Sequence, residues 1–248
     1  MTAPVIRRVR HELKRRDLTV RQTERLTPNM LRITLEGPEL ADFASGSFDD
    51  HLKVFIPQKE GDPQMRDYTP RRFDNDAQQL VIDFADHGEG PAASWARNAK
   101  EGDALKIGGP RGSRIIEGDI AHWVLIGDES ALPAIGRKVE ELPAGVTATV
   151  IAAVPSADDI QTFDTSADVS VTWVYRPFDQ ATDAAPFVDA IETLDLPENT
   201  FVWIATEAGV AKTLREKMLE RGHPLTWLKA AGYWVSGQAE SSIKDLDA

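Results

Sequence analysis

The segment Arg66-Asp67-Tyr68-Thr69 combines residue types that suit a flat ligand carrying phosphate. Alternate side chains of a strand share a face, so Arg66 and Tyr68 point the same way. An arginine can form bidentate hydrogen bonds with a pyrophosphate, a tyrosine can stack on a ring, and the Thr69 hydroxyl can donate a hydrogen bond. An ordinary surface strand can contain the same residues, so this segment alone leaves both interpretations open.

A glycine-rich turn that runs into a helix follows along the chain, in DFADHGEGPAASWA at residues 83–96. The first turn of a helix offers unpaired backbone N–H groups and the positive end of the helix dipole, which together favour phosphate. This turn and the arginine strand could hold the two ends of one diphosphate. The alternative is structural: His87 as a hydrogen-bonded turn residue and Trp95 as a core side chain.

A third segment, GDESALPAI at residues 127–135, follows the apolar stretch HWVLI and opens a helix. A dinucleotide can approach the backbone closely at such a place, at the carboxyl end of a parallel strand. The segment is not a GxGxxG fingerprint. Asp128 or Ser130 can also cap the helix, and capping is compatible with cofactor binding.

The surrounding patterns predict two kinds of domain. Residues 18 to 118 alternate apolar and polar side chains between Gly, Pro and Asp turns, which predicts an antiparallel barrel, with one helix at about residues 90–100. From residue 119 compact apolar strands alternate with helical segments, which predicts a mostly parallel sheet covered by helices. We therefore expect an N-terminal antiparallel β-barrel domain at residues 1–118 and a C-terminal α/β domain with a mostly parallel sheet at residues 119–248.

Composition narrows the function. The chain has no cysteine, which excludes disulfides, thiolate metal sites and a cysteine nucleophile, so redox chemistry requires a bound cofactor. The net charge of −12 argues against nucleic acid and anionic membranes as partners. The basic N-terminal stretch is either a solvated strand end or a local site for an anionic ligand. No segment has the apolar length of a signal sequence or a membrane span, so we expect a cytoplasmic protein without membrane insertion. We also expect a monomer, although nothing in the sequence determines the oligomeric state.

MRDYTPRRFD, DFADHGEGPAASWARNAKEGD, GGPRGS and GDESALPAIGR, in this order and spacing, resemble the siderophore-interacting protein family. These are ferric-siderophore reductases related to ferredoxin–NADP reductases, and the similarity extends over nearly the whole chain to GYWVSGQ. The resemblance implies that the N-terminal barrel is an antiparallel Greek-key β-barrel that binds FAD, and that the C-terminal domain binds NAD(P)H. The positions that match the family's FAD contacts are Arg66, Tyr68, Thr69, Asp83, His87, Gly88, Ala93, Ser94 and Trp95.

On the nicotinamide side the resemblance implies Asp128, Glu129, Ser130 and Glu207, and Lys53 matches a lysine on the substrate side. The sequence departs from the family's pattern at two places. Thr206 stands where a glycine is usual, and Val235 and Ser236 follow Gly232-Tyr233-Trp234 where a basic residue is common.

The resemblance implies an FAD-dependent oxidoreductase that reduces ferric siderophores and releases Fe(II), with NAD(P)H or a ferredoxin-type protein as electron donor. The flavin carries the chemistry, so we expect no catalytic side chain and no resident metal, with iron arriving as substrate. The alternatives are another reductase of the same superfamily and a siderophore-binding protein without turnover. The choice between NADH and NADPH stays open, because Arg176 could meet a 2′-phosphate whereas Asp158 and Asp159 could favour a free ribose hydroxyl.

Overall fold

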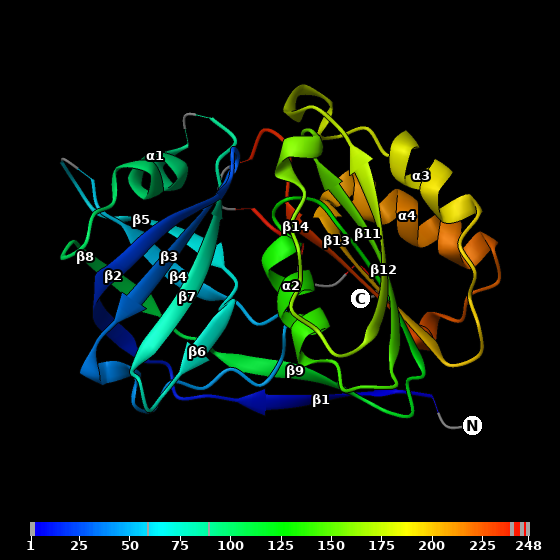
Figure 1. The fold of residues 1–248 in the computed structure, drawn as a ribbon, viewed down its shortest axis with the longest axis horizontal. Helices are drawn as coiled ribbons and strands as arrows, with labels where there is room; N and C mark the ends of the chain where they lie inside the picture. The colour runs from blue at the N-terminus through cyan, green and yellow to red at the C-terminus, as the bar shows by residue number, and fades with distance from the viewer. Residues whose placement is uncertain (1–2, 59, 89, 239–240, 244–245, 247–248) are drawn as a thin grey trace. The chain divides into compact units, whose positions relative to one another are not determined.

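The computed structural model describes residues 3–58, 60–88, 90–238, 241–243 and 246 (Figure 1). By its internal contacts the chain forms two compact units. One is Ile6–Ile116, and the other combines Met1–Val5 with Glu117–Ala248.

The first unit is built on an antiparallel sheet of seven strands in the order β5-β4-β8-β2-β3-β7-β6. Every pairing in this sheet for which a register is defined is antiparallel. The strands are β2 (Arg15–Thr27), β3 (Met30–Glu36), β4 (Leu52–Ile56), β5 (Gln64–Tyr68), β6 (Arg72–Asp74), β7 (Gln79–Ala85) and β8 (Ala104–Gly108), and a short 3₁₀ helix, η1 (Pro38–Leu40), follows β3.

This sheet curls around an apolar core. The rings of Tyr68 in β5 and Phe84 in β7 lie 4.3 Å apart, although the two strands are not hydrogen-bonded neighbours. Alternate residues of the strands point inward, as in β3, where Ile33 and Leu35 are fully buried. Helix α1 (Pro91–Asn98) packs on the core through buried alanines. The predicted antiparallel barrel is therefore confirmed as a curled half-barrel.

A separate two-stranded sheet joins β1 (Val5–Arg10) to β9 (Gly112–Glu117). The sequence pattern predicted strands only from residue 18, so β1 is an addition. The close pairing depends on Gly112, because a Cβ atom there would lie 2.3 Å from the Val9 carbonyl oxygen. Only a residue without a side chain allows this approach.

The second unit is a parallel sheet of five strands in the order β12-β11-β10-β13-β14. Strand β13 is buried along its whole length, as expected for a sheet covered on both faces. Helix α2 lies on one face, and α3 and α4 lie on the other (Figure 1). The elements are β10 (His122–Gly127), α2 (Leu132–Glu141), β11 (Thr147–Val154), η2 (Ala157–Asp159), β12 (Asp168–Tyr175), η3 (Phe178–Gln180), α3 (Ala185–Glu192), β13 (Thr200–Glu207), α4 (Ala208–Glu220), η4 (Leu225–Trp227) and β14 (Leu228–Trp234).

The order of this sheet reverses at β10, since β11 pairs on one side of it and β13 on the other. Ligands of open α/β sheets bind outside the carboxyl ends of the strands at such a switch point. The mostly parallel sheet expected for the C-terminal half is thereby confirmed, and its carboxyl edge is where this kind of fold binds a nucleotide.

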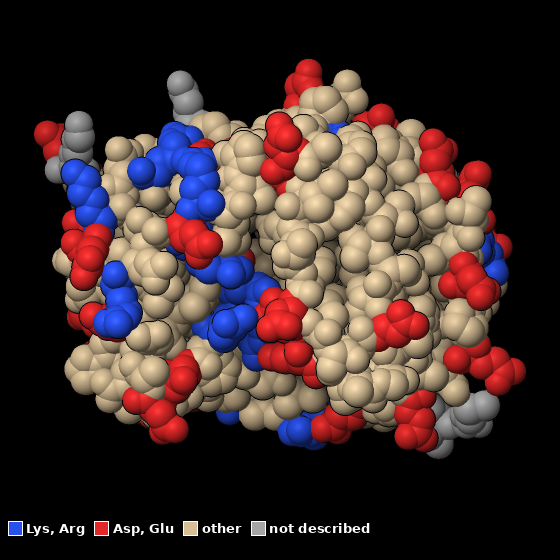
Figure 2. Space-filling view, viewed as in Figure 1, with Lys and Arg blue, Asp and Glu red and all other residues tan. Residues whose placement is uncertain are grey.

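Charge is unevenly distributed over the face drawn in Figure 2. Lys and Arg (blue) gather over the strands of the first unit, whereas the second unit shows scattered Asp and Glu (red) and little blue. On this face, therefore, the cations are concentrated on the first unit, although the chain as a whole has a net charge of −12.

Candidate functional site

Three aromatic rings form a row in the first unit. The ring of Phe84, which is fully buried, lies 4.3 Å from that of Tyr68 and 5.6 Å from that of Trp95 in α1. Tyr68 and Trp95 are partly buried, so each residue retains some accessible surface. Burial also raises the pKa of the Tyr68 phenol, which keeps it neutral and able to donate a hydrogen bond at physiological pH. The row provides rings on which a flat ligand can stack.

Arg66 lies two residues before Tyr68 on β5, and Thr69 directly follows that strand and is buried. The Arg66 guanidinium donates from Nη1 to the Met65 carbonyl oxygen at 2.9 Å and from Nη2 to Gln64 Oε1 at 2.8 Å. Both acceptors are neutral, and an anionic pyrophosphate is a stronger partner for a guanidinium than either. The arrangement keeps a cation beside the aromatic row.

Helix α1 begins at Gly90 and Pro91 without a side-chain cap. A hydrogen bond runs from the Ser94 N–H to the Gly90 carbonyl oxygen at 2.9 Å. Among the described residues no acceptor is assigned to the N–H groups of Ala92 and Ala93, which lie in the first turn, where helices offer N–H groups to a ligand or water. Phosphate is the ligand that such a helix start favours.

The turn before this helix is fixed by Arg97, which pairs with Asp86 and donates to the Gly88 carbonyl oxygen at 2.9 Å. Gly88 has φ +116°, a value that favours glycine, and His87 is exposed.

A groove of about 560 Å³ runs along α1. Ser94, Trp95 and Asn98 of the helix form one wall, and Pro57 and Gln58 after β4 contribute to the other. Clefts of this size hold small ligands and cofactors. The groove meets the aromatic row at Trp95, whereas Arg66, Tyr68 and Thr69 are not among its described lining residues. Stacking rings, a cation and a helix start without a side-chain cap suit a flavin dinucleotide, so the residues present fit FAD.

The carboxylate of Asp83 is almost completely buried and is held by arginines. Arg32 binds it with both ends of its guanidinium, at 2.7 and 2.8 Å, and Arg71 lies 3.7 Å away. The group therefore cross-links β3 and β7 and orients the buried Arg71. Its predicted contact with the cofactor stays a prediction.

Lys53 on β4 faces Asp67 on the neighbouring β5, with Nζ 2.9 Å from Oδ1. The lysine side chain is 38% exposed, so solvent screens this pair and it contributes little stability. Lys53 is thus held at the β4–β5 ladder but remains accessible, and its role toward a substrate stays a prediction.

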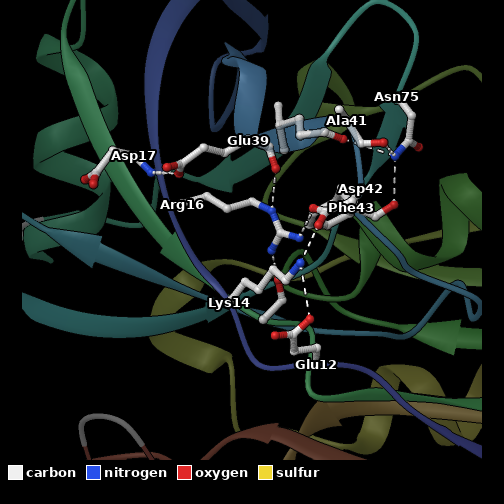
Figure 3. Close-up of polar contacts among 11 residues, drawn as sticks. Glu12, Lys14, Arg16, Asp17, Glu39, Ala41, Asp42, Phe43 and Asn75 are labelled. Atoms are coloured by element: carbon white, nitrogen blue, oxygen red, sulfur yellow. Dashed lines mark hydrogen bonds and ion pairs between the residues drawn. The ribbon is translucent and has the colours of Figure 1, made fainter.

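The basic N-terminal stretch is partly used for internal pairing (Figure 3). The buried Arg16 donates to the Glu39 and Gly109 carbonyl oxygens at 2.8 and 3.3 Å, and to Asp42 Oδ1 at 2.8 Å. Lys14 pairs with the same carboxylate, and the two cations lower the pKa of Asp42 to about 2. For Lys14 and Arg16 the structure therefore supports a structural role rather than a site for an anion.

In the second unit Asp128 joins three loops at the carboxyl edge of the sheet. Its Oδ1 accepts hydrogen bonds from the N–H and the hydroxyl of Ser130, at 3.0 and 2.5 Å. Its Oδ2 accepts from the Glu207 N–H at 3.0 Å and from the Trp234 indole N–H at 2.9 Å. This buried carboxylate therefore ties together the ends of β10, β13 and β14.

Glu207 is the N-cap of α4. Its Oε2 accepts hydrogen bonds from the N–H groups of Gly209 and Val210, at 2.6 and 3.1 Å, and its Oε1 accepts from the Ser236 N–H at 3.1 Å. The bond from Ser236 is donated by its backbone N–H. The unusual side chain at this position is therefore not needed for the contact with Glu207. The sequence placed Asp128 and Glu207 at one edge, but it did not indicate that their oxygens hold the Trp234–Ser236 segment.

Glu129 follows Asp128 and turns toward the end of β12. Its Oε2 lies 3.0 Å from Nη2 of Arg176, whose Nε and Nη1 have no hydrogen-bond partner among the described residues. Burial and the neighbouring Asp128 raise the pKa of Glu129 to about 7, against the opposing effect of Arg176. Because Arg176 is only 2% exposed, the arginine that the sequence offered to a 2′-phosphate is enclosed within the protein.

The described residues contain neither a candidate metal centre nor a helix that could span a membrane. No group of three or more His, Asp or Glu is placed to hold a metal ion. Within the same residues, no helix has the length and apolar character needed to cross a membrane.

A curled antiparallel sheet followed by a parallel α/β unit is the fold of the ferredoxin-reductase class of flavoproteins. Phthalate dioxygenase reductase has this fold in common with the chain, at 17% identity and a TM-score of 0.61, over 86% of this chain and 66% of that one. Family models narrow the class. The "Siderophore-interacting FAD-binding domain" matches residues 19–64 and 57–114, and "Siderophore-interacting protein" matches residues 120–237.

The chain belongs to the siderophore-interacting protein family. It is 33% identical to the NADPH-dependent ferric-chelate reductase of Escherichia coli, over 92% of this chain and 95% of the relative. It is 31% identical to the ferric vibriobactin reductase ViuB of Vibrio cholerae, over 89% of each. A solved siderophore utilization protein from T. fusca superposes with a TM-score of 0.86 at 33% identity, over 96% of this chain and 98% of that one.

Proposed function

We propose that this protein is an FAD-dependent oxidoreductase that takes electrons from NAD(P)H, reduces ferric siderophores and releases Fe(II). The observation that carries the proposal is the row of Tyr68, Phe84 and Trp95 beside Arg66 and the uncapped start of α1. Two relatives that match nearly the whole chain are named as ferric-chelate and ferric vibriobactin reductases, which supports the same substrate class.

We assign FAD to the N-terminal domain, residues 1–118. Arg66 and the N–H groups of Ala92 and Ala93 bind the pyrophosphate, and Tyr68 and Trp95 offer ring faces. Thr69, His87, Gly88 and Ser94 complete the proposed contacts, with Asp83 acting on them through Arg71. When bound, FAD would accept one hydride, which carries two electrons, and would pass these electrons on singly, as iron(III) requires.

We assign the nicotinamide nucleotide to the C-terminal domain, residues 119–248. Asp128 and Glu207 shape the site by fixing Ser130, Trp234 and the α4 N-terminus, since their oxygens already accept hydrogen bonds from protein. Lys53 offers a positive charge to an anionic ferric siderophore. A ferredoxin-type protein is the alternative donor, and anaerobic mixing of the holoprotein with each nucleotide separates the two.

Replacement of Arg66 tests the flavin site. Arg66→Ala removes a charge-assisted partner of the pyrophosphate, worth roughly 1.5–3 kcal/mol, and should weaken FAD binding about 10- to 150-fold. Arg21→Ala is the matched control, because Arg21 lies on the same sheet in an exposed pair with Glu36. Both variants are measured by titrating the apoprotein with FAD. Equal affinity in the two variants would remove Arg66 from the site.

We also propose that the protein acts as a monomer in the cytoplasm. Light scattering during size-exclusion chromatography and fractionation of cells test these two points. A yellow protein as isolated, with flavin absorbance, supports the reductase over a binding protein without turnover.

A further inference from the structure

Lys53 and Asp67 form an ion pair on the outer face of the curled sheet, away from its core. In β4 the side chains of Leu52 and Val54 are fully buried, whereas Lys53 between them points outward. Asp67 of β5 is its direct partner in the ladder, and Lys53 Nζ lies 2.9 Å from Asp67 Oδ1. Directly paired residues of antiparallel strands share a face, so Tyr68, which pairs with Leu52, points to the opposite side of the ladder. A substitution of Asp67 therefore leaves the Tyr68 side chain in place.

The carboxylate oxygen that faces Lys53 is shielded from solvent. Asp67 Oδ1 is buried, whereas the Lys53 side chain is 38% exposed. A ligand that arrives from solvent therefore reaches the ammonium group but not the oxygen with which that group is paired. It meets a positive and a negative charge together, and the fields of the two charges largely cancel at the distance of a ligand. Asp67 thus reduces the attraction that Lys53 exerts on an anion.

The row of residues beside Lys53 contains a second cation on an aromatic ring. Across the sheet Lys53 pairs with Gly108 of β8, and Gly108 pairs with Arg15 of β2. The Phe55 ring covers Gly108, since a Cβ atom there would lie 3.1 Å from Phe55 Cε2, and the Arg15 guanidinium lies 5.3 Å from the centre of the same ring. Two cations and one acid, Asp67, therefore set the charge of this row.

The proposed function places an anionic ferric siderophore at Lys53, and the inference rests on it. We propose that Asp67 is a specificity-determining residue of that site, which weakens the binding of anionic ferric siderophores by cancelling much of the Lys53 charge. A site with little net charge does not require an anionic substrate. Uncharged ferric hydroxamates are therefore substrates of this chain as well as anionic ferric catecholates.

The size of the effect follows from the charge of the chelate. The iron(III) complex of a tris-catecholate is a trianion, and that of a tris-hydroxamate is uncharged. At a separation of roughly 8 Å in water with about 0.1 M salt, the repulsion between the Asp67 carboxylate and a trianion corresponds to about three- to fivefold in affinity. The uncharged complex experiences no such repulsion, so removal of the Asp67 charge should change the ratio of the two affinities.

Binding is measured by titration calorimetry of the holoprotein with gallium(III) complexes, because gallium(III) has the charge and nearly the size of iron(III) but is not reduced. The tris-catecholate and the tris-hydroxamate are each titrated into the wild type, Asp67→Asn and the control Glu36→Gln. Glu36 also forms a cross-strand pair, with Arg21, and its strand β3 is separated from β4 by β2 and β8. At about 4.8 Å per strand the control changes the net charge equally but roughly 14 Å away, beyond the screening length of about 10 Å.

We expect Asp67→Asn to lower the Kd of the gallium catecholate about three- to fivefold and to leave the Kd of the hydroxamate unchanged. The gain should shrink as the salt concentration rises, and Glu36→Gln should change neither Kd. Lys53→Gln, a second variant that does not depend on how Asp67→Asn folds, should raise the Kd of the catecholate alone. The wild type should also reduce the ferric hydroxamate when an Fe(II) chelator is present.

Four outcomes would overturn the inference and leave the proposed function standing. They are an unchanged Kd of the catecholate in Asp67→Asn or in Lys53→Gln, an equal gain for both complexes in Asp67→Asn, an equal gain for the catecholate in Glu36→Gln, and a wild type that reduces the ferric catecholate but not the hydroxamate. A holoprotein that binds neither gallium complex and reduces neither ferric complex would remove the proposed function itself.

Discussion

Substitution of Asp83 tests how the first unit holds its arginines. Asp83→Asn keeps the shape of the side chain but removes its charge. In the wild type the carboxylate is 2% exposed, binds Arg32 in bidentate fashion at 2.7 and 2.8 Å, and lies 3.7 Å from the buried Arg71. The variant leaves the Arg71 guanidinium, which is 6% exposed, facing an amide.

The expected cost follows from this burial. Removal of one partner of a buried ion pair costs about 3–5 kcal/mol, and the remaining amide oxygen recovers about 1 kcal/mol as a neutral hydrogen bond. We therefore expect a loss of about 2–4 kcal/mol in the free energy of unfolding, a large share of the roughly 5–15 kcal/mol that stabilises a typical domain.

Urea unfolding followed by far-ultraviolet circular dichroism measures the loss. The control is Glu36→Gln, which breaks the exposed pair of Arg21 and Glu36 in the same sheet and should cost less than about 1 kcal/mol. If Asp83→Asn is no less stable than Glu36→Gln, the Asp83 network does not stabilise the fold as argued.

Three further predictions concern the second unit. The pKa of Glu129 is raised from 4.5 to about 7, so the folded protein holds this proton more tightly than the unfolded chain, and the resulting stabilisation is present below pH about 4.5 and is lost as the pH rises through about 7. Tm should therefore fall over this pH range, and Glu129→Gln should make the fall smaller. An unchanged slope of Tm against pH in the variant would refute the raised pKa. Gly127→Ala should lower Tm and slow the reduction of flavin by nucleotide, because the new Cβ atom would lie 2.7 Å from the Ala131 Cβ atom. If the variant keeps the Tm and the reduction rate of the wild type, α2 can shift to make room. Asp128→Asn should raise the KM for nucleotide without changing FAD content. In the double variant Trp234→Phe should raise this KM little further, because both substitutions disturb the same hydrogen bond between Trp234 and Asp128. Additive effects would show that the two residues act independently.

Much of the fold was predictable because buried residues recur along the sequence with the spacing of the helix or strand that contains them. In β3 the alternation of Ile33 and Leu35 with polar residues indicates a sheet with one buried face, and the apolar run of β13 indicates burial on both faces. Strand β1 was missed for the same reason. Nearly all its residues are exposed, so VIRRVR carries no pattern of burial, and its pairing depends on the absence of a side chain at Gly112.

For the candidate site, the sequence predicted which edge of the parallel sheet the residues lie on, but it did not predict which side chains contact one another there. Asp128 and Glu207 follow strands whose ends meet at one edge, which the strand–helix alternation indicates. The bond from Trp234 to Asp128 joins residues 106 positions apart, and no local pattern reports it. In the same way, the enclosure of Arg176 by Glu129 depends on the packing of two strand ends that are distant in sequence, so the sequence left its role open.

The most direct test of the central claim is an anaerobic redox cycle with the purified holoprotein. NADH or NADPH is added first, flavin absorbance is followed, and a ferric siderophore is then added with a chromogenic Fe(II) chelator. We predict that nucleotide bleaches the flavin, that the ferric siderophore restores its absorbance, and that roughly two Fe(II) appear per nucleotide oxidised, because a hydride carries two electrons. A flavin that nucleotide does not reduce, or that oxygen but no ferric siderophore reoxidises, would contradict the account.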